Sequence, residues 1–107
     1  MAFSAAEKNA IRELQSKLSG RYALVDFKIY GSKAVGTETP GSDIDIMIVL
    51  EQTSPEIESQ IDDTIFDINL KYDCLISAIF FSIDELEEGP FSESPIYKKA
   101  VSEGIQV

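Results

Sequence analysis

The chain has 107 residues, of which 44% are hydrophobic and 26% charged, as expected for one folded domain spanning residues 1–107. Its net charge of −10 disfavours nucleic acid as a partner, and no run approaches the roughly 18 apolar residues of a membrane span. The N-terminal residues do not resemble a signal peptide and the single cysteine excludes an internal disulfide, so we expect a cytoplasmic protein. The absence of histidine excludes Cys/His zinc sites, and the chemistry should therefore depend on carboxylates, hydroxyls, amides or a cation.

The chain begins with a predicted helix and a predicted strand. Ser4 and Glu7 have the spacing of a capping box, and the apolar residues that follow recur at helical spacing. We therefore expect a helix over residues 4–18, ended by Gly20. Residues 22–30 are rich in aromatic and branched side chains, which favours an extended strand.

A turn and loop precede a second predicted strand. Residues 32–35 fit a short helical turn, and residues 36–42 contain the glycines, threonines, proline and serine typical of a loop. Residues 43–50 then predict a strand. Both of its faces become apolar beyond Asp45, so we expect it to be central in a sheet and covered on both sides.

The second half of the chain alternates further helices with one strand. We expect helices over residues 54–72, 83–88 and 94–102, and Ser-Pro pairs open the first and the last of these helices. We also expect a strand over residues 74–81 and a terminal strand or tail over residues 105–107. The predicted elements follow the order helix, strand, strand, helix, strand, helix, helix. This order is typical of a small α/β domain of the α+β type. Its mixed sheet should be covered by helices.

Two aspartates open the second strand. Asp43 and Asp45 are two residues apart, so their carboxylates project from the same face. Because two ionised carboxylates this close repel each other, the pKa of one should rise unless a cation lies between them. Mg²⁺ suits such a pair, since it takes oxygen ligands and completes its shell with water and substrate phosphates. Taken alone, Asp-x-Asp is also ordinary turn chemistry.

A Gly-Ser pair precedes these aspartates by ten residues. Gly31 lets the backbone approach a ligand or adopt a positive φ, and Ser32 adds a hydroxyl ahead of outward-pointing amides, a combination that suits phosphate. Alone, the pair is more often a plain strand end. In this segment a Gly-Ser pair is followed by a loop, then by Asp-x-Asp and then by an apolar run. This order indicates the two halves of a nucleotidyl-transfer site, where metal ions bridge substrate phosphates.

The segment Gly31-Ser32, ten residues, then Asp43-Ile44-Asp45 resembles the signature of the nucleotidyltransferase superfamily that includes DNA polymerase beta. Within it, the chain is most similar to the minimal nucleotidyltransferases, specifically over residues 27–50 and more loosely beyond. The resemblance implies the nucleotidyltransferase fold, with Gly31 and Ser32 binding the nucleotide. It also implies Asp43 and Asp45 as catalytic residues that hold magnesium, either one ion or two.

The same resemblance implies an activity and a partner. The reaction would be transfer of a nucleotidyl group, foremost adenylyl, from ATP or another nucleoside triphosphate to a protein or small acceptor. Some members pair with a helical HEPN-type protein encoded beside them, and in toxin–antitoxin pairs the enzyme adenylylates the toxin.

One departure from the family pattern leaves alternatives open. The family usually supplies a third carboxylate from a neighbouring strand, but residues 74–81 contain no acid; Ser77 lies within that strand and Asp73 precedes it. A second hypothesis is therefore a weak or inactive subunit that acts as a partner-binding antitoxin, and a third is an unrelated metal-binding α/β domain. The acceptor, the base preference and the oligomeric state stay open.

Overall fold

The structure, a computed structural model, describes residues 3–31, 43–88 and 93–106. The elements follow one another as α1 (Ala5–Arg21), β1 (Leu24–Tyr30), β2 (Ile44–Leu50), α3 (Pro55–Tyr72), β3 (Ile76–Ser82), α4 (Ile83–Glu88), α5 (Pro95–Glu103) and β4 (Ile105–Gln106). The predicted class and order of elements are confirmed. The helical turn predicted at residues 32–35 and the loop at 36–42 lie outside the described residues.

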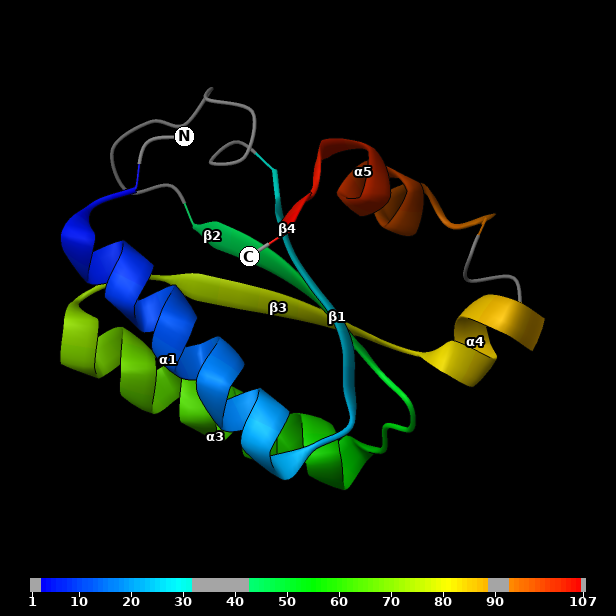
Figure 1. Ribbon diagram of the computed structural model, residues 1–107, viewed down its shortest axis with the longest axis horizontal. Helices are drawn as coiled ribbons and strands as arrows, with labels where there is room; N and C mark the ends of the chain where they lie inside the picture. Colours follow the sequence, from blue (N-terminus) through cyan, green and yellow to red (C-terminus); the bar gives the residue numbers. More distant parts are fainter. Residues whose placement is uncertain (1–2, 32–42, 89–92, 107) are drawn as a thin grey trace.

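The four strands form one mixed sheet in the order β3-β2-β1-β4 (Figure 1). β1 runs antiparallel to both β2 and β4, whereas β2 and β3 are parallel and connected through α3. Parallel neighbours require such a crossover, which here is the long helix. β2 is central, as predicted, and each of its residues except Asp45 is buried.

Helices cover both faces of the sheet (Figure 1). α1 and α3 lie side by side on one face and pack on the even-numbered residues of β2, such as Ile46 and Ile48. α5 and α4 contribute to the cluster on the other face, where Met47 and Val49 lie. Because side chains alternate along a strand, Asp45 belongs to the face covered by α5.

The start of α1 follows its sequence signals, but its end does not. The Ser4 hydroxyl accepts from the Glu7 amide at 3.1 Å, and the Glu7 carboxylate accepts from the Ser4 amide at 2.9 Å, which confirms the capping box. The prediction that Gly20 ends the helix is wrong, since α1 continues to Arg21. Glycine inside a helix costs only about 1 kcal/mol, so it lowers helix stability without forcing an end.

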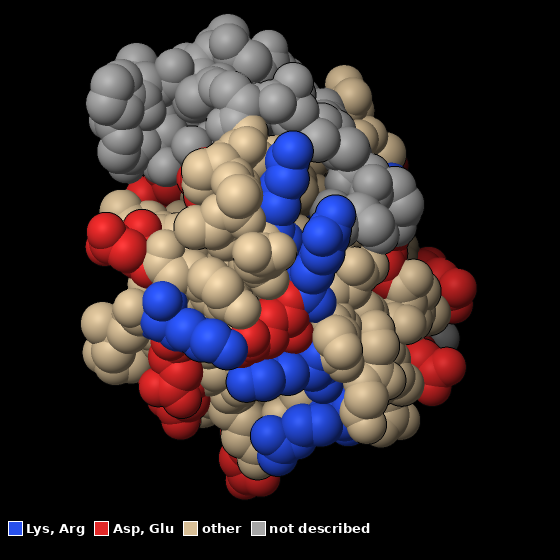
Figure 2. Space-filling view, turned by 60° about the vertical axis from the view of Figure 1, so that its left-hand side comes forward, with Lys and Arg blue, Asp and Glu red and all other residues tan. Residues whose placement is uncertain are grey.

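An acidic residue joins the two helices of the first layer. Glu13 on α1 accepts from the Lys71 ammonium at 2.7 Å and from the Tyr72 hydroxyl at 2.8 Å, and it also pairs with Lys17. The hydrogen bond from Lys71 is the main reason why the pKa of Glu13 falls to about 2. Figure 2 shows Lys and Arg side chains gathered beside acidic ones on one face of a molecule whose net charge is strongly negative.

The side chain of Asn69 joins α3 to β3. Its amide oxygen accepts from the Ile76 amide at 2.9 Å, and its amide nitrogen donates to the Ile76 carbonyl at 3.3 Å. β3 lies at the edge of the sheet, and the Leu75 carbonyl accepts from Ile44 of the β2 side. Since backbone groups alternate in direction along a strand, those of Ile76 point outward, and Asn69 satisfies them.

Candidate active site

The predicted carboxylates lie where β2 begins. Asp43 immediately precedes the strand and is exposed, whereas Asp45, its second residue, is half-buried. In the register of the sheet, Asp45 is opposite Tyr30 of β1 and Ser77 of β3. These three side chains therefore form one row across the sheet, on the face that α5 covers.

Gly31, directly after β1, brings the two halves of the sequence motif together. Its φ is +80°, a conformation that L side chains rarely adopt, and the residue is buried. A Cβ atom built there would overlap the Asp45 carboxylate. The carboxylate therefore occupies the space that glycine leaves free, and the backbone of Gly31 is in contact with a predicted metal ligand. Ser32, the other predicted nucleotide-binding residue, lies outside the described residues.

The pKa of Asp45 is raised, as the spacing of the carboxylates suggested for one member of the pair. Burial is the largest cause, the charge of Asp43 is second, and the positive charge of Lys99 on α5 acts in the opposite direction. The repulsion between the carboxylates, which the sequence predicted, is therefore not the main cause of the raised pKa. Burial contributes more because Asp45 lies on the central strand, beneath the layer that contains α5.

Sequence reasoning missed two residues near these carboxylates. Tyr30 pairs with Asp45 in the β1–β2 ladder, and its pKa is raised by burial and by the charge of Asp45. Strand pairing could have identified it, since it directly precedes Gly31. Lys99 is distant in sequence and acts on Asp45 because its neighbour Ala100 is buried against the sheet. No local spacing signals that contact.

The two carboxylates fit Mg²⁺ better than a metal that needs a complete protein cage. Magnesium binds through one or two carboxylates and takes its remaining ligands from water and phosphates. Within the described ranges, no group of three or more His, Cys, Asp or Glu side chains could hold a metal. The position opposite Asp45 on β3 is Ser77, which is exposed, and Asp73 is the left-handed C-cap of α3.

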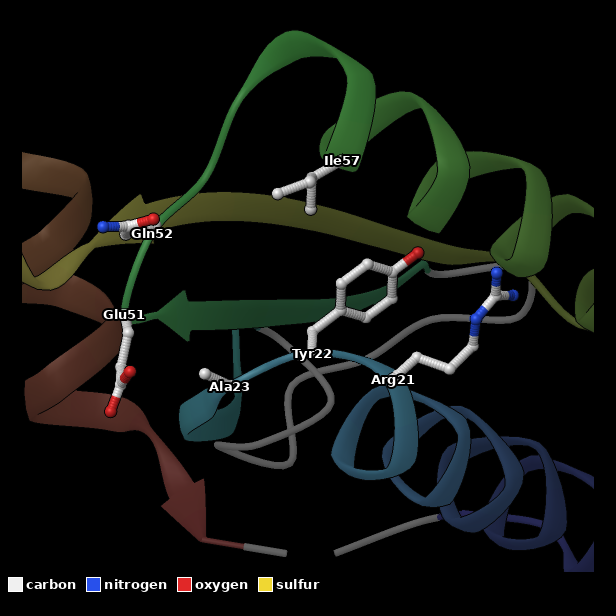
Figure 3. A pocket seen from close by; sticks show the side chains of 6 residues that line it. All are labelled: Arg21, Tyr22, Ala23, Glu51, Gln52 and Ile57. Atoms are coloured by element: carbon white, nitrogen blue, oxygen red, sulfur yellow. The ribbon is translucent and has the colours of Figure 1, made fainter.

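A pocket of about 260 Å³ lies at the other end of the sheet (Figure 3). It is lined by Arg21, Tyr22, Ala23, Glu51, Gln52 and Ile57. Figure 3 shows the Arg21, Glu51 and Gln52 side chains pointing in different directions, and the Tyr22 hydroxyl donates to Gln60 at 2.9 Å. Because its polar groups do not converge, we assign no chemistry to this pocket.

Comparison with known proteins identifies the family. The nucleotidyltransferase domain family matches residues 8–105. The chain belongs to this family. A structure described as a "putative minimal nucleotidyltransferase" is similar to this nucleotidyltransferase domain with a TM-score of 0.65 and 14% identity, over 100% of both chains. A structure described as a toxin–antitoxin with AMP-PNP has a TM-score of 0.62 and 20% identity, covering 92% of this chain and 70% of that one.

At these identities the structural likeness establishes the nucleotidyltransferase fold, which confirms the predicted fold class. The family match confirms the predicted family. No curated protein matches the sequence. Among the helices that the structure describes, none combines the length and apolarity needed to cross a membrane.

Proposed function

We propose that this nucleotidyltransferase domain transfers a nucleotidyl group, foremost adenylyl, from ATP bound with Mg²⁺ to a protein or small acceptor. The observation that carries the proposal is the contact between Gly31 and the Asp45 carboxylate, whose pKa burial and the charge of Asp43 raise. The backbone proposed to bind phosphate is thereby adjacent to a carboxylate proposed to hold the metal. The similar structure described with AMP-PNP supports an adenine nucleoside triphosphate as substrate.

Each proposed residue has a distinct part. Asp43 and Asp45 would hold magnesium, which when bound supplies positive charge to the phosphates of the nucleotide. Gly31 would bind those phosphates through its backbone, which no side chain of its own covers, and Ser32 would bind them through its hydroxyl. Burial and the charge of Asp43 both raise the pKa of Asp45, so the ionised pair is electrostatically costly without a cation.

Calorimetry with Mg²⁺ and ATP tests the site. We expect Asp43→Ala/Asp45→Ala to weaken Mg–ATP binding at least about 100-fold, which corresponds to roughly 2.7 kcal/mol. Asp62→Ala/Asp63→Ala removes the same charge from exposed positions on α3 and should leave the affinity unchanged. No binding by the wild type, or equal losses in both variants, would contradict the proposal.

We propose that a helical HEPN-type protein encoded beside this chain is the acceptor or a stable partner. The similar structure described as a toxin–antitoxin supports a protein partner. Labelled ATP incubated with both proteins tests this: label should appear on the partner, and Asp45→Asn should abolish it. A partner that neither binds nor receives label would overturn this part of the proposal.

Ser77 favours a second candidate, a subunit that binds nucleotide and partner without efficient transfer. It is exposed and stands opposite Asp45, and β3 contains no carboxylate. In this case the wild type should bind Mg–ATP and its partner but transfer no label, and Ser77→Asp should make transfer of label detectable by supplying a proton acceptor. Transfer by the wild type that Asp45→Asn abolishes would eliminate the second candidate.

A further inference from the structure

Two large apolar side chains lie exposed on the outer face of α3. Phe66 is 63% exposed and Leu70 is 68% exposed, more than any other large hydrophobic residue in the described part of the chain. They are four residues apart, so they are neighbours on the helix surface. The core-facing side of α3 is formed by other residues, among them Ile61, Ile65 and Ile68.

The contacts of α3 show that Phe66 and Leu70 do not belong to its packing within the fold. One side of the helix contacts α1 through Lys71 and Tyr72, and another reaches β3 through Asn69. Phe66 and Leu70 occupy the remaining, outward side. Single exposed apolar residues are ordinary on protein surfaces, whereas adjoining ones form a continuous apolar patch that a partner can cover.

Acidic residues border this pair along the helix. Asp62, Asp63 and Asp67 are exposed and lie within one helical turn of Phe66 or Leu70, and Asp73, the exposed C-cap of the helix, follows Leu70 by three residues. We refer to the two apolar residues and these four aspartates as the α3 surface. Burial and the neighbouring charge of Asp63 raise the pKa of Asp62, as expected where carboxylates are crowded.

The charge of the border selects the kind of partner. A second copy seated symmetrically on the same surface would place eight carboxylates around one contact, and like charges opposed across an interface are costly. A partner whose apolar residues are bordered by Lys and Arg would instead satisfy both the apolar centre and the acidic border.

We propose that the α3 surface is a docking site for an amphipathic helix of a partner protein, with an apolar stripe bordered by Lys and Arg. A helix offers apolar side chains at the i, i+3 and i+4 spacing that fits the Phe66–Leu70 pair. α3 covers the sheet face opposite the one that carries Asp45, so a docked helix leaves the carboxylates accessible. The inference is independent of the activity proposed above.

The probe for this surface is a synthetic 18-residue helical peptide with a leucine stripe bordered by lysines, titrated into the full chain at physiological ionic strength. A matched peptide carries glutamates in place of the lysines. We expect only the lysine peptide to bind. Phe66→Ser/Leu70→Ser should weaken its binding at least tenfold, and Asp62→Lys/Asp67→Lys should do the same. Circular dichroism checks that each variant folds.

Ile96→Ser/Val101→Ser is the matched control, because both residues are about as hydrophobic and are exposed on α5. Its affinity for the lysine peptide should stay within twofold of the wild type. The proposal is overturned if the lysine peptide fails to bind, if both peptides bind equally, or if the control variant loses as much affinity as Phe66→Ser/Leu70→Ser. A wild-type dimer that Phe66→Ser/Leu70→Ser abolishes would assign the surface to a second copy and also overturn it.

Discussion

Gly31 combines a left-handed backbone with contact against a carboxylate, so it is a sensitive position for substitution. In Gly31→Ala, a left-handed alanine costs about 1 to 2 kcal/mol, and the added Cβ displaces the side chain of Asp45. We expect denaturant unfolding to show this loss of stability, and calorimetry to show that Mg–ATP binding is lost.

Gly20→Ala provides the matched control for that substitution. Gly20 lies inside α1, and nothing stands within 4 Å of a Cβ built there. Alanine should therefore raise stability by about 0.5 to 1 kcal/mol and leave nucleotide binding unchanged. Equal effects of the two substitutions would show that Gly31 has no special role.

At the residue scale, the sequence predicted a set of site residues but not the contacts between them. The spacing of Gly31, Asp43 and Asp45 indicated one site, because their order and types suit phosphate and a divalent cation. It could not indicate that Gly31 makes room for Asp45, which depends on the register between β1 and β2. Lys99 was beyond local reasoning, since only tertiary packing brings α5 to the site.

At the scale of elements, Glu13 makes the contact between α1 and α3 dependent on pH. Its folded pKa of about 2 is below the ordinary value of 4.5, so its ion pairs stabilise the fold above pH 4.5, and this stability is lost as the pH falls towards 2. We expect Glu13→Gln to lower the melting temperature at pH 7, and the difference from wild type to shrink between pH 4.5 and 2.

Glu87→Gln on exposed α4 removes the same charge without touching the contact between α1 and α3, and serves as the control. Its melting temperature should follow that of the wild type across the same pH range. A constant difference between Glu13→Gln and wild type down to pH 2 would show that the ion pairs of Glu13 contribute no pH-dependent stability.

Helix starts were predictable because their signals are local. Ser54 and Ser94 each accept from a backbone amide three residues on, and a proline follows each of them, as the Ser-Pro pairs indicated. Helix ends and strand starts depend more on packing. β1 begins two residues later than predicted, at Leu24, because α1 extends through Gly20 and its C-cap is Tyr22.

For the whole molecule, the sheet separates the two proposed sites. The carboxylates lie on the face covered by α5, and the α3 surface lies beyond the helices of the other face. Phe66→Ser/Leu70→Ser should therefore leave Mg–ATP affinity unchanged, and Asp43→Ala/Asp45→Ala should leave the affinity for the lysine peptide unchanged. The effects of combining all four substitutions should add within about 0.5 kcal/mol in each titration, because the sites share no partners.

An exposed sheet edge also carries a risk of aggregation, since its unpaired backbone groups can recruit strands from other molecules. β3 is such an edge among the described strands, and it begins with the two backbone groups that Asn69 binds. The side-chain amide of Asn69 thus forms with Ile76 the two hydrogen bonds that a neighbouring strand would otherwise form at the start of β3. By occupying that position, Asn69 protects the start of the edge strand from fibril-like extension by other molecules.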